Sequence, residues 1–245
     1  MIFNILTLFP EMFHVFLETS IIGRSVENEL LDVNLINVRE FSKDKHKSVD
    51  DAPYGGGPGM VMTPQPLKDA IISVKKESHI IFLSPKGQPL TQEKVMSLSQ
   101  KSNVTLICGH YEGIDQRIID TYVDEELSIG DYVLTGGELG AMVVVDAVTR
   151  VLPEVLGDED SYKEDSHYNG LLDHPHYTRP QAFDGKKVPA VLLSGHHENI
   201  MQWRLEQSIL NTYKKRPDLI EKKINSQPTK SKFSKQIRNT LKKYL

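Results

Sequence analysis

The sequence contains very little cysteine and no long apolar run. Cys108 is the only cysteine among 245 residues, which excludes an intramolecular disulfide framework and a zinc site built on cysteines. No apolar stretch approaches the roughly 18 residues that a membrane-spanning helix needs. The apolar segment 1–17 follows no basic segment and is interrupted by Glu11, so we expect no signal peptide and a cytoplasmic protein.

Several common enzyme motifs are absent as well. The chain has no GxGxxG dinucleotide turn, no GxxxxGKS/T phosphate loop, no GxSxG nucleophile motif and no HExxH zinc motif. The segment nearest to a phosphate loop is 54–60, YGGGPGM, whose glycines permit close approach of a ligand to the backbone. No lysine or helix-starting hydroxyl follows it at the required place. A flexible surface loop is therefore the simpler interpretation of these glycines alone.

Both signs of charge are present, but they are unevenly distributed. The formal net charge of −4, taken as a total, argues against a nucleic-acid-binding protein. Residues 201–245, however, hold 12 Lys and Arg against 3 Asp and Glu, a local charge of +9 that leaves −13 for the rest of the chain. This division indicates two parts with different partners, although a solvated helix face stays open as an interpretation of the basic part. A second basic cluster at 39–47 precedes the glycine-rich loop and suits a phosphate backbone.

Short apolar runs alternate with helix-like stretches over the first 150 residues. Strands are predicted over 2–9, 33–38, 80–83 and 104–108, and helices over 21–31, 66–76, 92–100 and 139–151. This alternation predicts an α/β fold with a largely parallel sheet that is covered on both faces. Residues 157–169 are polar and acidic and predict a mobile linker. Helices predicted over 200–213, 217–224 and 231–244 make the second part mainly α-helical.

Three loops rich in glycine or proline each follow an apolar run. They lie at 83–87 (LSPKG), 108–113 (CGHYEG) and 128–137 (SIGDYVLTGG). In an open parallel sheet, the loops after the carboxyl ends of the strands line the ligand crevice. Glycines there expose backbone groups that can read the edge of a purine, while Ile129 and Leu134 can supply apolar walls. Together the three loops predict a small-molecule pocket.

Two histidine-rich segments, 173–176 (DHPH) and 194–198 (SGHHE), are further candidates. Adjacent histidines such as His196 and His197 point in opposite directions on an extended chain, so we predict no metal site and favour contacts to RNA or plain surface. The linker contains Glu164 and Asp165. A carboxylate in a mobile segment can act as a general base once substrate orders it, and simple solvation is the alternative.

A set of strings along the chain carries a family resemblance. In chain order they are ILTLFPEMFH at 5–14, YGGGPGMV at 54–61, LSPKG at 83–87, CGHYEGIDQ at 108–116, SIGDYVLTGGELG at 128–140, GLLDHPHYTRPQ at 170–181, SGHHENIM at 194–201 and WRLEQSIL at 203–210. In this order they resemble the bacterial tRNA (guanine-N1)-methyltransferases, the TrmD type of the SPOUT class. The resemblance covers the chain apart from its last few dozen residues.

That resemblance implies S-adenosylmethionine as methyl donor and the guanine at tRNA position 37, just 3′ of the anticodon, as acceptor. It implies an α/β fold with a SPOUT-type parallel sheet and a deep trefoil knot, plus a small, mainly α C-terminal domain. The assembly is expected to be a homodimer with the active site at the subunit interface. The domains are expected at 1–157 (knotted, donor-binding), 158–172 (flexible linker) and 173–245 (helical, binding the anticodon stem-loop of tRNA).

The resemblance also assigns roles to individual residues. Asp165 matches the base that removes the proton of guanine N1, and Arg150 matches the arginine that stabilises charge growing on O6. Donor binding falls on Leu83, Ser84, Pro85, Gly109, Tyr111, Glu112, Ser128, Ile129, Gly130, Tyr132, Leu134, Gly136 and Gly137. Contacts to tRNA fall on His46, Asp50, Tyr54, Gly55, Gly59, Asp173, His176, Arg179 and His196. Mg²⁺ stays open as an assisting ion.

Two positions depart from the family pattern, and two other functions compete. Gly140 stands where proline is common, which bears on the rigidity of the donor pocket, and His167 replaces an aromatic residue after the EDS triplet. A non-catalytic RNA-binding protein on the same fold is one alternative, but it would have no need of Arg150, Asp165 and the Glu112 loop together. A small-molecule methyltransferase is another, and it would have no need of the basic C-terminal part.

Overall fold

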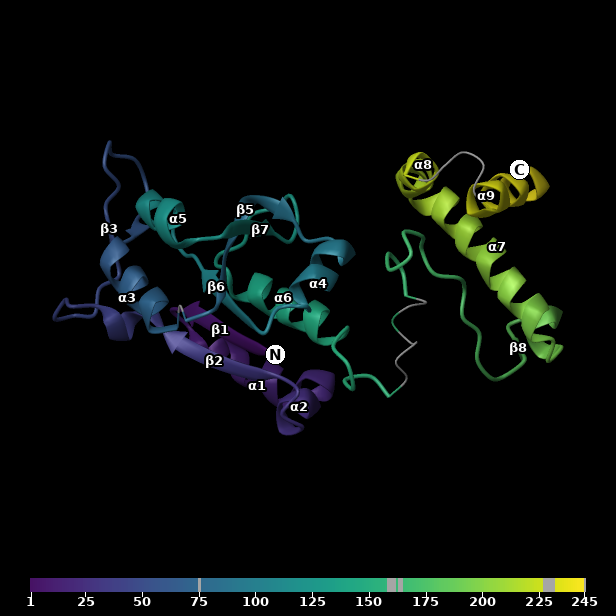
Figure 1. Cartoon of the computed structure of the whole chain (residues 1–245), viewed down its shortest axis with the longest axis horizontal. Coiled ribbons are helices and arrows are strands. Elements are labelled where there is room, and N and C mark those ends of the chain that lie inside the picture. The colour runs from purple at the N-terminus through teal and green to yellow at the C-terminus, as the bar shows by residue number, and fades with distance from the viewer. Residues whose placement is uncertain (75, 158–161, 163–164, 227–231, 245) are drawn as a thin grey trace. The chain divides into compact units, whose positions relative to one another are not determined.

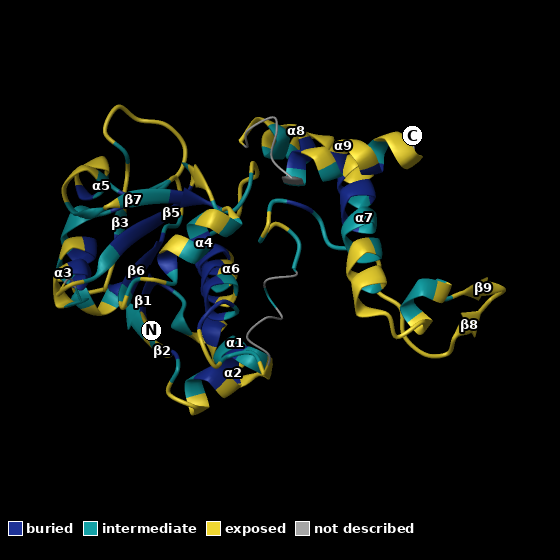
Figure 2. Ribbon diagram, turned by 45° about the vertical axis from the view of Figure 1, so that its right-hand side comes forward, coloured by how far each residue is buried: buried dark blue, intermediate teal, exposed yellow. Residues whose placement is uncertain are grey.

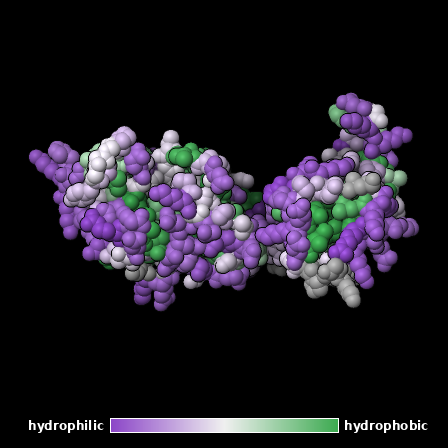
Figure 3. All heavy atoms as spheres, turned by 90° about the horizontal axis from the view of Figure 1, so that it is seen from above, coloured by the Kyte–Doolittle hydropathy of each residue, from purple (hydrophilic) through white to green (hydrophobic). Residues whose placement is uncertain are grey.

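The chain forms two compact units, 1–159 and 160–245. The computed structural model describes residues 1–74, 76–157, 162, 165–226 and 232–244, and each unit is described by itself (Figure 1). No helix in these described segments is long and apolar enough to cross a membrane. On the face drawn in Figure 3, hydrophilic residues cover most of the surface of both units, interrupted by apolar patches.

The first unit is built on a five-stranded sheet in which all neighbouring strands are parallel. Its strand order is β2 (Asp32–Asn37), β1 (Ile2–Thr7), β6 (Asn103–Cys108), β5 (His79–Pro89) and β7 (Glu125–Ser128). The strands β1, β5 and β6 carry the β-branched and apolar runs expected of strands that are covered on both faces. The predicted α/β fold with a parallel central sheet is therefore confirmed.

Helices cover both faces of this sheet. Along the chain they are α1 (His14–Glu18), α2 (Ser20–Glu27), α3 (Pro64–Val74), α4 (Gln92–Leu98), α5 (Gln116–Tyr122) and α6 (Glu138–Thr149). Thr91 and Asp115 cap the N-termini of α4 and α5, because their side chains accept hydrogen bonds from the backbone N–H groups of Lys94 and Arg117. Short 3₁₀ turns at Pro10–Phe13 and Val38–Phe41 and a small hairpin of β3 (Asp50–Asp51) and β4 (Val61–Met62) complete the unit.

Alternating residues of each strand serve the two faces. Leu6 of β1 packs in a buried cluster with Ile71 of α3 and Ile118 of α5. Its neighbour Ile5 points to the opposite face, where α6 contacts β1 and β6. The central strands and the inner side of α6 are dark blue in Figure 2, and exposed residues gather in the loops. The sheet therefore forms the rigid middle layer that carries the loops at its edge.

Several elements and one boundary differ from the sequence prediction, which also lacked α1 and the hairpin of β3 and β4. The strand β7 and the helix α5 were not predicted, because EELS has no apolar run and α5 is only seven residues long. The segment 83–87, expected as a loop, lies within β5 as an irregular part of the strand. Leu83 pairs with Leu127, and the pairing with β7 resumes only at Gln88, so the intervening residues bulge out of the ladder.

The second unit is mainly helical. Its helices are α7 (His197–Lys215), α8 (Pro217–Asn225) and α9 (Lys232–Tyr244), and a hairpin of β8 (Ala182–Phe183) and β9 (Lys186–Lys187) precedes a 3₁₀ turn at Ala190–Leu193. Its core holds Leu171, Ile209, Ile220 and Ile237, with Leu205 and Phe233 packed against them. Through Leu171, this small core joins the three helices to the chain segment that precedes β8.

The predicted linker 158–172 lies partly outside the described residues, which omit 158–161 and 163–164. Its last part is bonded to the second unit. The backbone N–H of Leu172 donates to Thr212 Oγ1 at 2.8 Å, and the N–H of Asp173 donates to Ser166 Oγ at 3.0 Å. Leu171 is buried in the core of the same unit. The mobility of the linker stays a prediction.

Candidate active site

A cavity of about 220 Å³ lies at the carboxyl ends of β6 and β7 and beside the bulge of β5. Three segments line it, and they are the three glycine-bearing segments singled out in the sequence. Every residue predicted to bind the donor lies on its wall: Leu83, Ser84, Pro85, Gly109, Tyr111, Glu112, Ser128, Ile129, Gly130, Tyr132, Leu134, Gly136 and Gly137. The structure thus brings this set together in one place, and what they bind stays a prediction.

The first wall is the bulge of β5. The hydroxyl of Ser84 accepts a hydrogen bond from the backbone N–H of Lys86 at 3.2 Å, which bends the chain away from the sheet. Gly87 closes the bulge, because a Cβ there would lie 2.4 Å from the backbone nitrogen of Leu127. Only glycine allows β5 to rejoin β7 so closely.

The second wall follows β6. A Cβ on Gly109 would lie 2.8 Å from the ring of Phe82, so the backbone runs directly along that ring. The N–H of Glu112 donates to the carbonyl of Met60 at 3.0 Å, which ties this loop to the end of the glycine-rich segment. Tyr111 adopts a positive φ of 58° at the tip of the turn. The loop is therefore held by backbone contacts on both sides.

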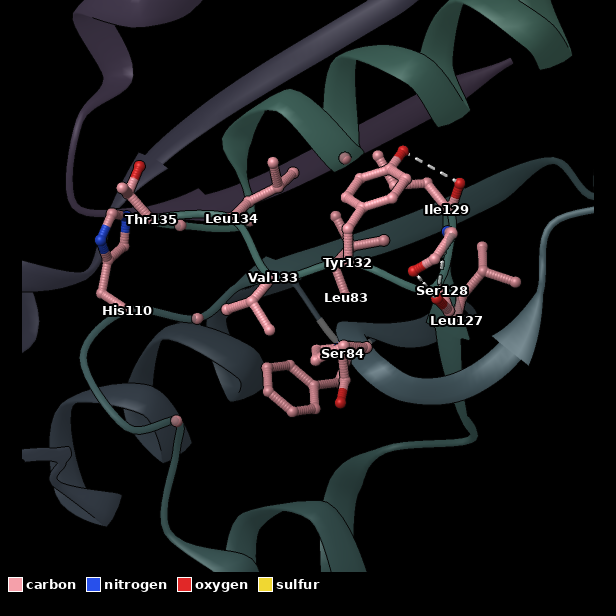
Figure 4. A pocket seen from close by; sticks show the side chains of 18 of the residues that line it. Leu83, Ser84, His110, Leu127, Ser128, Ile129, Tyr132, Val133, Leu134 and Thr135 are labelled. Atoms are coloured by element: carbon pink, nitrogen blue, oxygen red, sulfur yellow. Dashed lines mark hydrogen bonds between the residues drawn. The ribbon is translucent and has the colours of Figure 1, made fainter.

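The third wall runs from the end of β7 to the start of α6. Ser128 Oγ donates to the carbonyl of Gly130 at 3.0 Å, and the Tyr132 hydroxyl donates to the carbonyl of Ile129 at 3.2 Å. Figure 4 shows Ser128 and Ile129 at one end of the pocket and His110 and Thr135 at the other. Between them Tyr132, Val133 and Leu134 remain 54%, 84% and 40% exposed. The third wall therefore presents apolar side chains to solvent.

Two lining residues, Phe82 and Leu127, lie just outside the predicted segments. Each directly precedes a predicted residue, so the apolar runs that lead into these segments were the available signal. His110, Gly113, Val133 and Thr135 lie within the predicted segments without having been named individually, and Gly140 was noted as a departure from the family pattern. Behind the pocket lies Cys108, fully buried, and burial raises the pKa of its thiol well above the ordinary value. A thiol that stays protonated is a poor nucleophile, so this cysteine is not suited to covalent catalysis.

The two predicted catalytic residues lie in different units. Arg150 is half-buried at the end of α6 in the first unit, where its N–H donates to the carbonyl of Asp146 at 3.0 Å. Asp165 is half-buried in a turn of the second unit, where its N–H donates to the carbonyl of Tyr162 at 3.2 Å. Their roles stay predictions.

The substrate residues predicted in the first unit lie in exposed segments around β3 and β4. His46 is exposed, and its N–H donates to Asp44 at 2.7 Å. Asp50 begins β3, while Tyr54 is fully exposed. Gly55 has a positive φ of 89° with open space around it, and Gly59 lies against the Glu112 side chain. Of these residues, Gly59 is thus in contact with a residue of the cavity wall.

The substrate residues predicted in the second unit are Asp173, His176, Arg179 and His196. Asp173 Oδ2 lies 2.6 Å from His176 Nε2, and its Oδ1 lies 2.7 Å from His174 Nδ1. Arg179 is exposed, and His196 is exposed just before α7, with Nδ1 3.1 Å from the carbonyl of Ser194. Burial by itself would raise the pKa of Asp173, but the hydrogen bonds from His176 and from the His174 backbone outweigh it and lower that pKa.

The cluster of Asp173, His174 and His176 is the one group among the described residues that could hold a metal ion, with ligand atoms within 4.8 Å of one another. One carboxylate with two imidazoles suits a transition metal, whereas Mg²⁺ prefers a shell of oxygen atoms. The cluster therefore does not fit the Mg²⁺ that was left open from the sequence.

Comparison with known proteins places this chain in a class. The family model of the tRNA (guanine-1)-methyltransferases, TrmD, matches residues 1–222. A tRNA (guanine-N(1)-)-methyltransferase of Ruminiclostridium cellulolyticum is 55% identical over 227 residues, covering 91% of this chain and 97% of the relative. Proteins of the same name from Clostridium perfringens and Oceanobacillus iheyensis are each 54% identical over 89% of this chain, covering 93% and 91% of those relatives.

The class is that of tRNA methyltransferases, here built on a parallel central sheet. The chain belongs to the tRNA (guanine-1)-methyltransferase family TrmD and is an enzyme of that family.

Proposed function

We propose that this chain transfers a methyl group from S-adenosylmethionine to N1 of the guanine at position 37 of tRNA. The observation that carries the proposal is the glycine-walled cavity at the carboxyl ends of β6 and β7 and the bulge of β5, since parallel sheets bind ligands at the carboxyl ends of their strands. Family membership supports the reaction, and the names of the relatives support tRNA as its substrate. Because tRNA is the substrate, we place the activity in the cytoplasm.

The cavity has the chemistry that S-adenosylmethionine requires. Tyr132, Val133 and Leu134 offer exposed apolar surface that a flat adenine ring would cover. Gly109 and Gly136 leave the backbone of two walls accessible, so N–H and C=O groups are available to the polar edge of the ligand. Bound there, the donor supplies an electrophilic methyl group. The trefoil knot that the family implies belongs to this proposal, with the three walls as its loops.

The acceptor chemistry requires a base and a positive charge. Guanine N1 carries a proton in the neutral base, so its lone pair is not free to attack a methyl group. Asp165 removes that proton while negative charge grows on O6. Arg150 stabilises the O6 charge through its guanidinium, and the methyl transfer would require sulfur, methyl carbon and N1 to lie in line. Each of the two side chains thus acts on a different atom of the guanine.

Exposed cations of the second unit suit the phosphates of a tRNA stem-loop. Lys235, Arg238 and Lys242 are exposed on α9, a strongly amphipathic helix whose apolar side packs in the core of the unit. Contacts from Lys and Arg to phosphates provide affinity without reading the sequence. We assign tRNA anchoring to this helix and the selection of guanine to the catalytic residues.

The test is a methylation assay with a matched pair of RNAs. The purified protein is incubated with methyl-labelled S-adenosylmethionine and an unmodified tRNA transcript that carries G37, and in parallel with a transcript that differs only by A37. We expect label in N1-methylguanine for G37 and background for A37. Binding of both transcripts without any label would instead indicate a non-catalytic RNA-binding protein, and equal labelling would contradict position 37.

A homodimer with the active site at its interface is part of the proposal. If Arg150 and Asp165 of one site come from different subunits, a mixture of Arg150→Ala and Asp165→Ala chains contains one intact site in each heterodimer. About a quarter of the wild-type rate is then expected after subunit exchange, from the statistics of random pairing. No recovery in a mixture shown by mass spectrometry to contain heterodimers would contradict a site shared in this way.

A further inference from the structure

Glu138 is a buried carboxylate that the proposed chemistry does not use. It is the first residue of α6 and only 2% exposed. Thr7 Oγ1 donates to its Oε1 at 2.6 Å, and His110 Nε2 lies 2.8 Å from both carboxylate oxygens. Carboxylates are rarely buried to this extent, because removal from water is costly unless partners replace the lost hydration. The burial of this carboxylate therefore calls for a structural or functional reason.

The surroundings of Glu138 supply hydrogen-bonding partners to both of its carboxylate oxygens. The side chain stands in the first turn of α6, where the free backbone N–H groups and the helix dipole favour a negative charge. A carboxylate can only accept hydrogen bonds, so His110 must carry its proton on Nε2 to donate to it. His110 also contacts the ring of Phe9 edge-on at 5.0 Å between centroids. The pair therefore fixes both the tautomer and the orientation of His110.

This pair lies where two walls of the cavity meet. His110 and Gly136 form an antiparallel bridge, and the N–H of Gly137 donates to the carbonyl of Gly109 at 3.0 Å. A Cβ on Gly136 would lie 2.2 Å from His110 Cε1 and 2.6 Å from Glu138 Oε2, so the backbone packs directly against the pair. Figure 4 shows His110 beside Thr135 at this end of the pocket. The spacing of the second and third walls thus depends on the pair.

We infer that Glu138 and His110 are a positioning pair, which holds the 109–113 and 134–137 segments at the spacing that binds S-adenosylmethionine. The inference rests on the proposed function and deepens it. Glu138 touches neither substrate in this account and acts through His110 and Gly136. Loss of the pair weakens donor binding, while the proton transfer by Asp165 and the charge stabilisation by Arg150 are left in place.

The chain offers a matched control for the chemistry of the pair. Glu125 begins β7, at the opposite end of that strand from the pocket residue Ser128. Its carboxylate lies 2.8 Å from His79 Nε2 and also pairs with Lys94. Glu125→Gln therefore perturbs a second histidine–carboxylate pair of the same sheet that does not line the cavity.

The experiment measures the donor Kd by calorimetry and the kinetic constants of the full-length variants. We expect Glu138→Gln to raise the Kd and KM for S-adenosylmethionine by about 10-fold to 100-fold, since one acceptor of a buried network is lost. The value of kcat at saturating donor and the KM for tRNA should stay within about threefold. Glu125→Gln should leave the donor Kd within about twofold.

A second pair of variants separates positioning from mere folding. The amide nitrogen of glutamine reaches about as far as Nε2 of histidine and can donate to Glu138, whereas alanine cannot. His110→Gln should therefore retain most of the donor affinity that His110→Ala loses. Equal donor affinity in Glu138→Gln and wild type, or equal losses in the two His110 variants, would overturn the inference. A wild-type protein that bound no S-adenosylmethionine would overturn the proposed function as well.

Discussion

The two units hold their functional residues in opposite ways. In the first unit, the cavity is built from backbone held in place by strand pairing, by glycines without room for a Cβ, and by the buried Glu138–His110 pair. In the second unit, the residues predicted to meet tRNA are exposed side chains such as Arg179 and His196. A small donor of constant shape can be met by a rigid cavity. A large polyanion is met by charges spread over a surface.

The largest expected effect concerns Asp165, the proposed base, which is neither part of the cavity wall nor a fully exposed side chain. Asp165→Asn keeps the shape of the side chain but cannot accept the N1 proton, so we expect kcat to fall by about 10²-fold to 10⁴-fold with an unchanged Kd for S-adenosylmethionine. Single-turnover methylation and calorimetry measure the two quantities. Asp184→Asn, in the hairpin turn between β8 and β9, is the control and should keep wild-type turnover. A comparable loss in both variants would argue against Asp165 as the base.

The next prediction concerns the addition of a single atom, the Cβ of alanine at Gly137, to the wall of the cavity. A Cβ on Gly137 would lie 2.6 Å from Cys108 Cα, which is backbone and has no rotamer to yield. We expect Gly137→Ala to weaken donor binding by at least about 10-fold and to lower the free energy of unfolding by about 1–3 kcal/mol. Calorimetry and urea denaturation measure these changes.

Gly140→Ala is the comparison at another lining residue of the cavity, in α6, the helix that Gly137 precedes. A Cβ there would meet Leu83 Cδ1 at 3.5 Å, an ordinary contact, and alanine favours a helix over glycine by about 0.5–1 kcal/mol. This variant should be as stable as the wild type or more so. If both variants lost donor affinity equally, the tight glycine packing would not be what shapes the pocket. The family departure at Gly140 would then matter more than the ordinary contacts of an added Cβ indicate.

The sequence predicted the pocket better than it predicted the elements around it. The segments 83–87, 108–113 and 128–137 were found from glycines at strand ends, and the structure gathers them at one sheet edge. The strand β7 was missed because the acidic sequence EELS lacks the apolar pattern of a strand. It is a strand because it pairs with β5 in the folded sheet, and strand propensity is a weak guide at such positions.

The Glu138 network could not have been predicted from spacing. Thr7 and Glu138 are 131 positions apart, and His110 and Glu138 are 28 apart. A glutamate after two glycines is typical of the first turn of a helix, where it is usually exposed to solvent. Its burial follows from the way α6 packs against β1 and β6, which no local pattern encodes.

A smaller effect tests the surface design of the second unit. Lys235→Gln combined with Arg238→Gln removes two exposed cations of α9, so tRNA binding should weaken at low salt. The slope of log K against log salt should fall by about one per residue, with donor affinity unchanged. The control combines Lys68→Gln and Lys76→Gln, two exposed lysines of the first unit, and should keep the slope. Filter binding over a salt series would contradict the assignment if both double variants behaved alike.

The smallest effect concerns the pH dependence of stability and the carboxylate of Asp173, which pairs with His174 and His176. The pKa of Asp173 is lower in the folded protein than its ordinary value of 3.8, because hydrogen bonds from His176 and the His174 backbone outweigh the effect of burial. A lowered folded-state pKa stabilises the fold fully above the unfolded value and loses that contribution as pH falls through the folded value. The stabilisation is therefore present from about pH 5 upward and fades below about pH 4.

Asp173→Asn removes this titration, so its melting temperature should change less between pH 5 and pH 3 than that of the wild type. Asp184→Asn, in the exposed hairpin turn between β8 and β9, should follow the wild type. Differential scanning fluorimetry resolves the comparison if it is read from the second unit, for which the fluorescence of Trp203, the single tryptophan, is a local reporter. Trp203 lies 6.4 Å from the His174 ring between centroids, so it senses the segment that Asp173 holds. Parallel acid transitions for wild type and Asp173→Asn would mean that the carboxylate of Asp173 does not order the exposed residues of this unit. The second unit would then differ even more from the first, in which the buried Glu138–His110 pair holds the cavity walls.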